Sequence, residues 1–182
     1  KATKNFDENI ICMIDGSQSA VHSKVDVQDL GCDFFALTGH KLYGPNGVGI
    51  LWGKFDLLNS MPPFLGGGDM IETVSFDGTV YKAAPFKFEA GTPAIVEVIG
   101  LGAAIDYLNA IGMDAIAVHE KEMLNYMVQK LGTIEGLNFY GTAQEKAGII
   151  SFTADWAHIS DIAMILDQQG VALRTGHHCC MP

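Results

Sequence analysis

Short apolar runs separated by turn-forming residues occupy the first third of the chain. Runs of this length that are apolar on both faces are typical of buried strands in a parallel sheet. Each is followed by polar or glycine residues, so we expect chemistry-bearing side chains where the strands end. The three runs, each with the residues that end it, are 10–14 with Asp15-Gly16, 33–37 with Thr38-Gly39, and 47–52 with Gly53.

A polar stretch and a long helical pattern follow the predicted strands. Residues 66–87 begin with three glycines, and their composition predicts an irregular surface excursion with a turn at Asp77-Gly78. Pro93 then opens a helical pattern over 94–110, which ends at Gly112.

The remainder of the chain predicts helices alternating with short strands. This alternation favours an α/β fold, and the change of pattern near Gly112 is the best domain boundary, dividing the chain into 1–111 and 112–182. The expected elements are a helix over 114–131, an apolar run over 148–152, a helix capped by Ser160 and ending near Gly170, and a short strand over 171–173.

Charge narrows the classes of partner. The 182 residues include 21 acidic and 11 basic side chains, without any cluster of Lys or Arg. Such a chain repels a phosphate backbone, so we do not expect it to bind nucleic acid. No apolar stretch reaches about 20 residues, so no membrane span is expected.

Cysteine usage suggests a reducing compartment. The four cysteines have no CxxC spacing, and the first residues lack the apolar core of a signal peptide. We therefore expect reduced thiols and a cytoplasmic protein. We expect Cys12 and Cys32 to be buried and inert.

Two polar clusters follow the first two predicted strands. Asp15 either caps a turn or faces a cationic group of a ligand, because a carboxylate at a buried strand end needs such a partner. Lys41, beside His40, is either a solvated loop residue or a partly desolvated amine that attacks an aldehyde. Both alternatives stay open on local sequence alone.

A third cluster lies at the end of the chain. Arg174 is the single arginine, and Thr175-Gly176-His177-His178 separates it from Cys179 and Cys180. These cations would favour the reactive thiolate of cysteine. The alternative is zinc, but four adjacent ligands do not readily surround one tetrahedral ion, so we expect no metal site.

The three clusters together fit one class of enzyme. Pyridoxal phosphate needs a lysine for its aldehyde, a carboxylate for its pyridinium nitrogen and small or hydroxylated residues at its phosphate. Asp15 and Lys41 have a spacing that lets one strand carry the acid and the next apolar run present the lysine. The joint occurrence is far more specific than either residue alone.

The chain resembles a known family along its whole length. It resembles the group II, or Suf-type, cysteine desulfurases of iron–sulfur cluster assembly, within the class V aminotransferase-like family of fold type I. That fold implies part of a large, mainly parallel-sheet domain in 1–111, which binds pyridoxal phosphate, and the start of a smaller α+β domain in 112–182. The matching motifs are Asp15-Gly-Ser-Gln18, Thr38-Gly-His40-Lys41-Leu-Tyr-Gly-Pro, Phe88-Glu-Ala-Gly91-Thr92-Pro and Arg174-Thr-Gly-His-His-Cys179.

The resemblance implies roles in holding the cofactor. Lys41 corresponds to the lysine that forms a Schiff base, and Asp15 to the partner of the pyridinium nitrogen. Gln18 corresponds to the donor to the phenolic oxygen. Thr38 and His40 correspond to residues that hold the phosphate.

Further roles concern the partner subunit and the substrate. Gly91 and Thr92 match a segment that reaches the phosphate of the opposite subunit, which implies a homodimer. Cys179 corresponds to the catalytic nucleophile, with Arg174 close by as a substrate-binding group. The implied reaction converts L-cysteine to L-alanine and leaves a persulfide on Cys179, which passes to a sulfur-acceptor protein.

Two other functions remain open beside the desulfurase. One is a selenocysteine lyase or another class V enzyme. The second is an inactive fragment or binding module, since a complete family member carries further cofactor residues in an N-terminal half and a C-terminal arginine that this chain lacks.

Cys180 stands where the family commonly has a small residue; it is either a packing substitution or a second thiol near the persulfide. A partial chain should also expose apolar sheet edges, so we expect self-association or a complementing segment.

Overall fold

The computed structural model describes residues 2–178 and 181, and it divides into two compact units, Lys1–Ile116 and Ala117–Pro182. The division falls inside a helix, a few residues after Gly112. That 1–111 belongs to a cofactor domain and 112–182 to a smaller domain stays a prediction.

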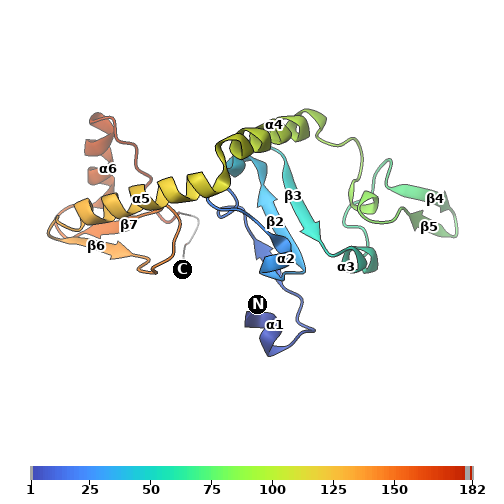
Figure 1. Ribbon diagram of the computed structural model, residues 1–182. Coiled ribbons are helices and arrows are strands. Elements are labelled where there is room, and N and C mark those ends of the chain that lie inside the picture. The colour runs from blue at the N-terminus through green and yellow to red at the C-terminus, as the bar shows by residue number, and fades with distance from the viewer. Residues whose placement is uncertain (1, 179–180, 182) are drawn as a thin grey trace. The chain divides into compact units, whose positions relative to one another are not determined.

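The first unit contains a three-stranded sheet in the order β1-β2-β3 (Figure 1). β1 (Met13–Asp15) runs parallel to β2 (Phe34–Thr38), with Asp15 opposite Ala36, and β2 runs antiparallel to β3 (Gly49–Gly53). The predicted apolar runs therefore form strands, shifted by one to three residues.

Burial differs from the expectation for these strands. Phe34 and Phe35 of the central strand are buried, but Ile50 and Leu51 of β3 are 43% and 52% exposed. The prediction that all three strands are buried is wrong for β1 and β3, because within the described residues each has a neighbouring strand on one side only.

The polar stretch after the sheet is more regular than expected. It forms an antiparallel hairpin of β4 (Ile71–Ser75) and β5 (Gly78–Tyr81), with Ser75 opposite Gly78. The turn lies where Asp77-Gly78 predicted it, and the expectation of an irregular excursion is corrected to a hairpin. The smaller helices of this unit are α1 (Ala2–Phe6), α2 (Val27–Leu30), α3 (Phe55–Ser60) and the 3-10 turns η1 (Gly39–Leu42) and η2 (Phe86–Phe88).

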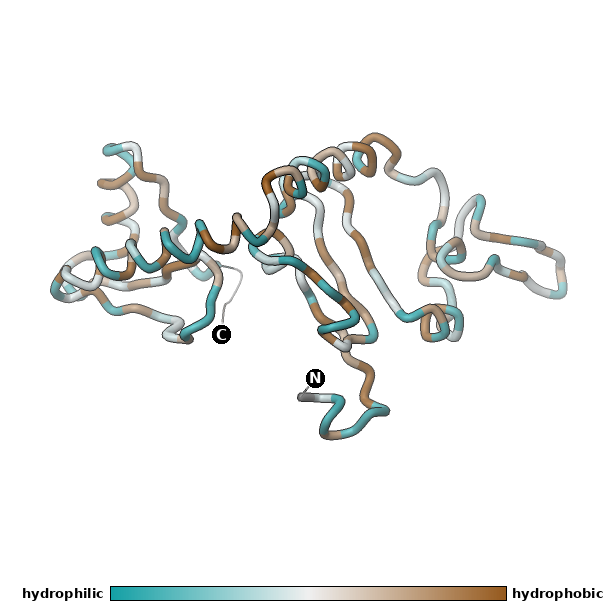
Figure 2. Tube along the Cα trace, in the orientation of Figure 1, coloured by the Kyte–Doolittle hydropathy of each residue, from teal (hydrophilic) through white to brown (hydrophobic). Residues whose placement is uncertain are grey.

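The long helix α4 (Ile95–Ile111) builds the core of the first unit. Its Leu101 and Leu108 are almost fully buried and cluster with three residues from the sheet side of the unit, Ala20, Val21 and Leu42. The helix ends at Gly112, whose φ of 94° lies in a region that glycine adopts without strain, as its sequence predicted. Figure 2 shows apolar residues along much of this helix.

The second unit combines helices with a two-stranded sheet. α5 (Met113–Leu131) leads into β6 (Leu137–Tyr140), which pairs antiparallel with β7 (Ser151–Ala154), and α6 (Ile159–Gln168) follows. The cap of α6 is His158, whose side chain accepts the N–H of Ser160, so Ser160 is not the cap that the sequence predicted. Residues 171–178 contain no strand, which corrects the expected strand over 171–173.

Within the described residues, no single helix is long and apolar enough to cross a membrane; α4 and α5 pass such a test on length and composition only when taken together as a bent pair.

Candidate active site

The ends of β1 and β2 bring together residues that the sequence singled out. Because the two strands are parallel, their carboxyl ends lie at the same edge of the sheet, where α/β proteins place ligands. Asp15 ends β1, Thr38 ends β2, and Lys41 follows in η1. Topology thus places a carboxylate, a hydroxyl and an amine at one edge.

Asp15 is exposed and its carboxylate is held by the turn that follows. Its Oδ1 accepts the Ser17 N–H at 2.9 Å. Hydrogen bonds from the Ser17 side chain and backbone lower the pKa of Asp15. Desolvation opposes them, and the positive charge of Lys41 is the smallest of the causes that lower this pKa. Asp15 therefore caps the turn. That it also faces a cationic group of a ligand stays a prediction.

Thr38 and His40 form a polar pair beside the lysine. Thr38 Oγ1 and His40 Nδ1 lie 2.9 Å apart. Lys41 itself is exposed, so the described residues do not provide the desolvation that its sequence context suggested. Gln18 lies on the segment after Asp15, with its Nε2 3.3 Å from Nε2 of His22.

The predicted phosphate residues Gly91 and Thr92 lie on a different loop, immediately before α4. Gly91 has a φ of 83°, and its N–H donates to the carbonyl oxygen of Gly68 at 2.9 Å. This hydrogen bond ties the loop to the glycine-rich stretch 66–68. Thr92 is exposed.

The remaining predicted residues belong to the second unit. Arg174 is exposed within a segment without regular secondary structure. Cys179, and Cys180 after it, lie outside the described residues. Of the cysteines within them, Cys12 and Cys32 are free thiols; Cys32 is buried as expected, while Cys12 is only half-buried.

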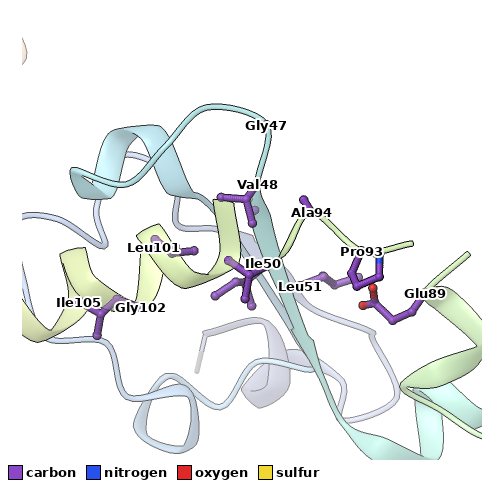
Figure 3. A pocket seen from close by; sticks show the side chains of 12 residues that line it. Gly47, Val48, Ile50, Leu51, Glu89, Pro93, Ala94, Leu101, Gly102 and Ile105 are labelled. Carbon is purple, nitrogen blue, oxygen red and sulfur yellow. The ribbon is translucent and has the colours of Figure 1, made fainter. Parts of the chain in front are cut away.

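Sequence reasoning missed some features of the first unit. Hydrogen bonds from Ser17 lower the pKa of Asp15, and the Asp-x-Ser sequence could have indicated this turn. A groove of about 550 Å³ between β3 and α4 was not predicted (Figure 3). The groove is mostly apolar, with the Glu89 carboxylate at one end. The nearly continuous apolar pattern of α4 could have indicated it.

Among residues 2–178 and 181, no group of three or more His, Cys, Asp or Glu side chains is placed to hold a metal ion.

Comparisons with known proteins identify the family of the chain. The family model "Aminotransferase class-V" matches residues 1–182. A probable cysteine desulfurase of Streptomyces coelicolor is 53% identical over 175 residues, which are 95% of this chain and 42% of that protein. The chain thus spans less than half the length of the curated relatives it matches.

Solved structures give the same result. The cysteine desulfurase CsdA of Escherichia coli matches with a TM-score of 0.90 and 40% identity, over 97% of this chain and 44% of that one. A variant of C-DES with glycine covalently linked to its PLP cofactor matches with a TM-score of 0.74 and 29% identity, over 87% of this chain and 42% of that one. These likenesses confirm the predicted α/β fold of type I. The chain belongs to the class V aminotransferase family.

Proposed function

We propose that the protein to which this chain belongs is a pyridoxal-phosphate-dependent cysteine desulfurase of the Suf-type group. The observation that carries the proposal is the placement of Asp15 and Lys41 after neighbouring parallel strands, at one edge of the sheet. The similarity to desulfurases from several bacteria supports it.

The polar groups at the sheet edge fit this cofactor by their chemistry. Lys41 offers an amine for an aldehyde, and Asp15 offers a carboxylate that stays charged, as a pyridinium partner requires. Gln18 offers an amide for the phenolic oxygen. The Thr38 and His40 pair offers donors for a phosphate, and we assign Gly91 and Thr92 to the phosphate of a second subunit. When bound, pyridoxal phosphate supplies an electron-withdrawing ring next to the substrate carbon.

Each of these residues then has a separate role in the reaction of L-cysteine. Lys41, as a base and acid near the substrate, moves a proton from and to its carbon atoms. Asp15 keeps its negative charge and would stabilise the protonated ring nitrogen of pyridoxal phosphate. The Cys179 thiolate attacks the substrate sulfur, so a sulfur–sulfur bond forms as the carbon–sulfur bond breaks. The products are L-alanine and a Cys179 persulfide, so sulfur is transferred with no external oxidant. We assign Arg174 to the substrate or persulfide.

The persulfide needs an acceptor. We propose that it passes to a sulfur-acceptor protein for iron–sulfur cluster assembly, that the enzyme is a homodimer, and that it works in the cytoplasm, where thiols stay reduced. The free thiols of Cys12 and Cys32 agree with a reducing compartment.

The test measures alanine release and cofactor colour in three variants. Lys41→Ala should lose the visible absorbance of bound pyridoxal phosphate, whereas Cys179→Ser should keep the colour and lose alanine release from cysteine. Cys180→Ser is the matched control and should keep both. Desulfurase turnover in Cys179→Ser would overturn the nucleophile assignment, and faster alanine release from selenocysteine than from cysteine would favour a selenocysteine lyase.

A further inference from the structure

The turn that carries Lys41 is packed against helix α4. Leu42, the next residue, is buried in the core cluster beside Leu101 and Leu108 of that helix. Lys41 is exposed, so its own side chain provides no anchor. The position of the amine therefore depends on how the backbone around residue 41 is held.

Hydrogen bonds close this turn at both ends. The Gly39 N–H donates to the carbonyl oxygen of Val48 at 2.8 Å, and the Gly39 carbonyl oxygen accepts the N–H groups of Tyr43 and Gly44. Tyr43 has a φ of 59°, a strained value for a bulky side chain. Such a conformation persists only where surrounding residues impose it, so contacts of the residues after Tyr43 help to hold the backbone of this turn.

Gly44 lies against Leu101 of α4, and a second contact joins Pro45 to Gly100 on the same helix. A Cβ atom built on Gly100 would lie 2.6 Å from Cγ and 3.2 Å from Cδ of Pro45, closer than packed carbon atoms approach. The ring of Pro45 thus sits where an alanine methyl group would be. Gly102, two residues further along the same helix, has no atom within 4 Å of a built Cβ.

We propose that Gly100 is a positioning residue for Lys41, which deepens the proposed function and rests on it. The missing side chain lets Pro45 pack on α4, and this contact holds the turn 39–45 so that the lysine stays near Asp15. A methyl group at position 100 would push Pro45 and the turn away. Misplacing a reacting group by about 1 Å can cost roughly 100-fold in rate, so a small shift is measurable.

The experiment compares Gly100→Ala with Gly102→Ala in the protein to which this chain belongs. Both replace a glycine in the interior of one helix, so both gain the same roughly 1 kcal/mol of helix propensity. Without cofactor, amide NMR signals of 39–45 should shift in Gly100→Ala and stay in place in Gly102→Ala. In a second measurement, pyridoxal phosphate is added, the adduct on Lys41 is trapped with borohydride, and its amount is followed by mass spectrometry. We expect the adduct to form at least about tenfold more slowly in Gly100→Ala and at the unaltered rate in Gly102→Ala.

Two further variants protect the test against misfolding. Pro45→Ala removes the ring without adding bulk, and it should also shift the 39–45 signals and slow trapping. The double variant Gly100→Ala/Pro45→Ala should recover part of the loss relative to Gly100→Ala. Equal signals and trapping rates in Gly100→Ala and Gly102→Ala would overturn the inference. Failure of the unaltered protein to attach cofactor at Lys41 would instead count against the proposed function, while the NMR comparison would still decide whether Gly100 holds the turn.

Discussion

Gly16 lies directly against the ring of Phe35: a Cβ atom built on Gly16 would fall 2.6 and 2.7 Å from Cε1 and Cε2 of that ring and nearer still to its tip. Gly16 directly follows β1, and Phe35 lies within the neighbouring strand β2; the Gly16 N–H also donates to the Ala36 carbonyl oxygen at 2.8 Å. Gly16 is thus packed against the buried Phe35 ring and hydrogen-bonded to β2, which fixes the backbone next to Asp15.

Replacing Gly16 by alanine should therefore disturb Asp15. Phe35 is 4% exposed and has little room to move, so we expect Gly16→Ala to cost about 1–3 kcal/mol in the free energy of unfolding. Urea titration measures this cost. Gly66→Ala is the control, because no atom lies within 4 Å of its built Cβ. Equal urea midpoints for the two variants would contradict the packing argument.

Ser17 should control the titration of Asp15. The Ser17 side chain is the largest cause of the lowered pKa of Asp15. In Ser17→Ala the backbone N–H remains but the hydroxyl is lost, so the pKa should rise toward the usual value, and the carboxylate should protonate at a higher pH. An NMR titration of the Asp15 side chain checks this, with Ser19→Ala as the control. A pKa that stays equally low in Ser17→Ala would assign the effect to the backbone and Lys41.

Asp33 should make the chain sensitive to acid. This carboxylate is 3% exposed and accepts Lys4 Nζ at 2.6 Å, Lys54 Nζ at 2.7 Å and the Cys12 N–H at 2.8 Å. These hydrogen bonds, that of Lys4 first, hold the pKa of Asp33 far below its usual range. Because the folded pKa is below the unfolded value of about 4, the stabilisation is present above that pH and is lost as the pH falls toward the folded value.

We therefore expect the urea midpoint of the unaltered chain to fall as the pH drops from about 5 to 3. Asp33→Asn should be less stable at pH 7 by about 3 kcal/mol, since it leaves two ammonium groups without their carboxylate, and its stability should depend less on pH. Asp56→Asn, on the exposed start of α3, is the control. An unchanged pH dependence in Asp33→Asn would reject this account.

Lys87 should hold the loop that precedes α4. Its side chain is buried, its Nζ donates to the Asn59 carbonyl oxygen at 2.7 Å near the end of α3, and it lies 5.3 Å from the centre of the Phe88 ring. Cations stabilise helix carboxyl ends, so this contact ties η2 to α3. Lys87→Met should cost about 1–3 kcal/mol and raise hydrogen exchange in 86–92.

Lys82→Met is the matched control for Lys87. Lys82 pairs at 2.9 Å with Asp69, which is largely exposed, and such pairs contribute at most about 1 kcal/mol. Hydrogen exchange of 86–92 in Lys82→Met should match that of the unaltered chain. Equal protection in both variants would show that Lys87 does not hold the loop.

The exposed apolar side of α4 should make the chain associate. Val96 and Ile99 are 76% and 69% exposed, although a helix that is apolar almost all round is typical of a buried element. Sedimentation should reveal self-association of the 182-residue chain, and Ile99→Lys should reduce it, whereas Asn109→Lys on the same helix should not. A monomer at all concentrations tested would contradict the expectation of covered apolar surfaces.

Local signals in the sequence predicted much of the fold. Pro93 and Gly112 bracket α4, and Asp77-Gly78 marks the hairpin turn, because these preferences depend on one or two residues. The strand over 171–173 and the cap at Ser160 were wrong, because strand pairing and cap choice depend on neighbours that are distant in sequence or on a competing side chain such as His158.

The sequence by itself determined which residues carry chemistry and to which family their order and spacing point. Asp15 and Lys41 stand out because a carboxylate and an amine follow apolar runs and belong to motifs that match one family in order. Only the tertiary structure decided what holds them: the parallel pairing of β1 and β2, the Ser17 hydrogen bond, and the packing of Pro45 on Gly100. Close packing depends on distances of a few tenths of an ångström between residues far apart in the chain, and no pattern along the chain encodes those distances.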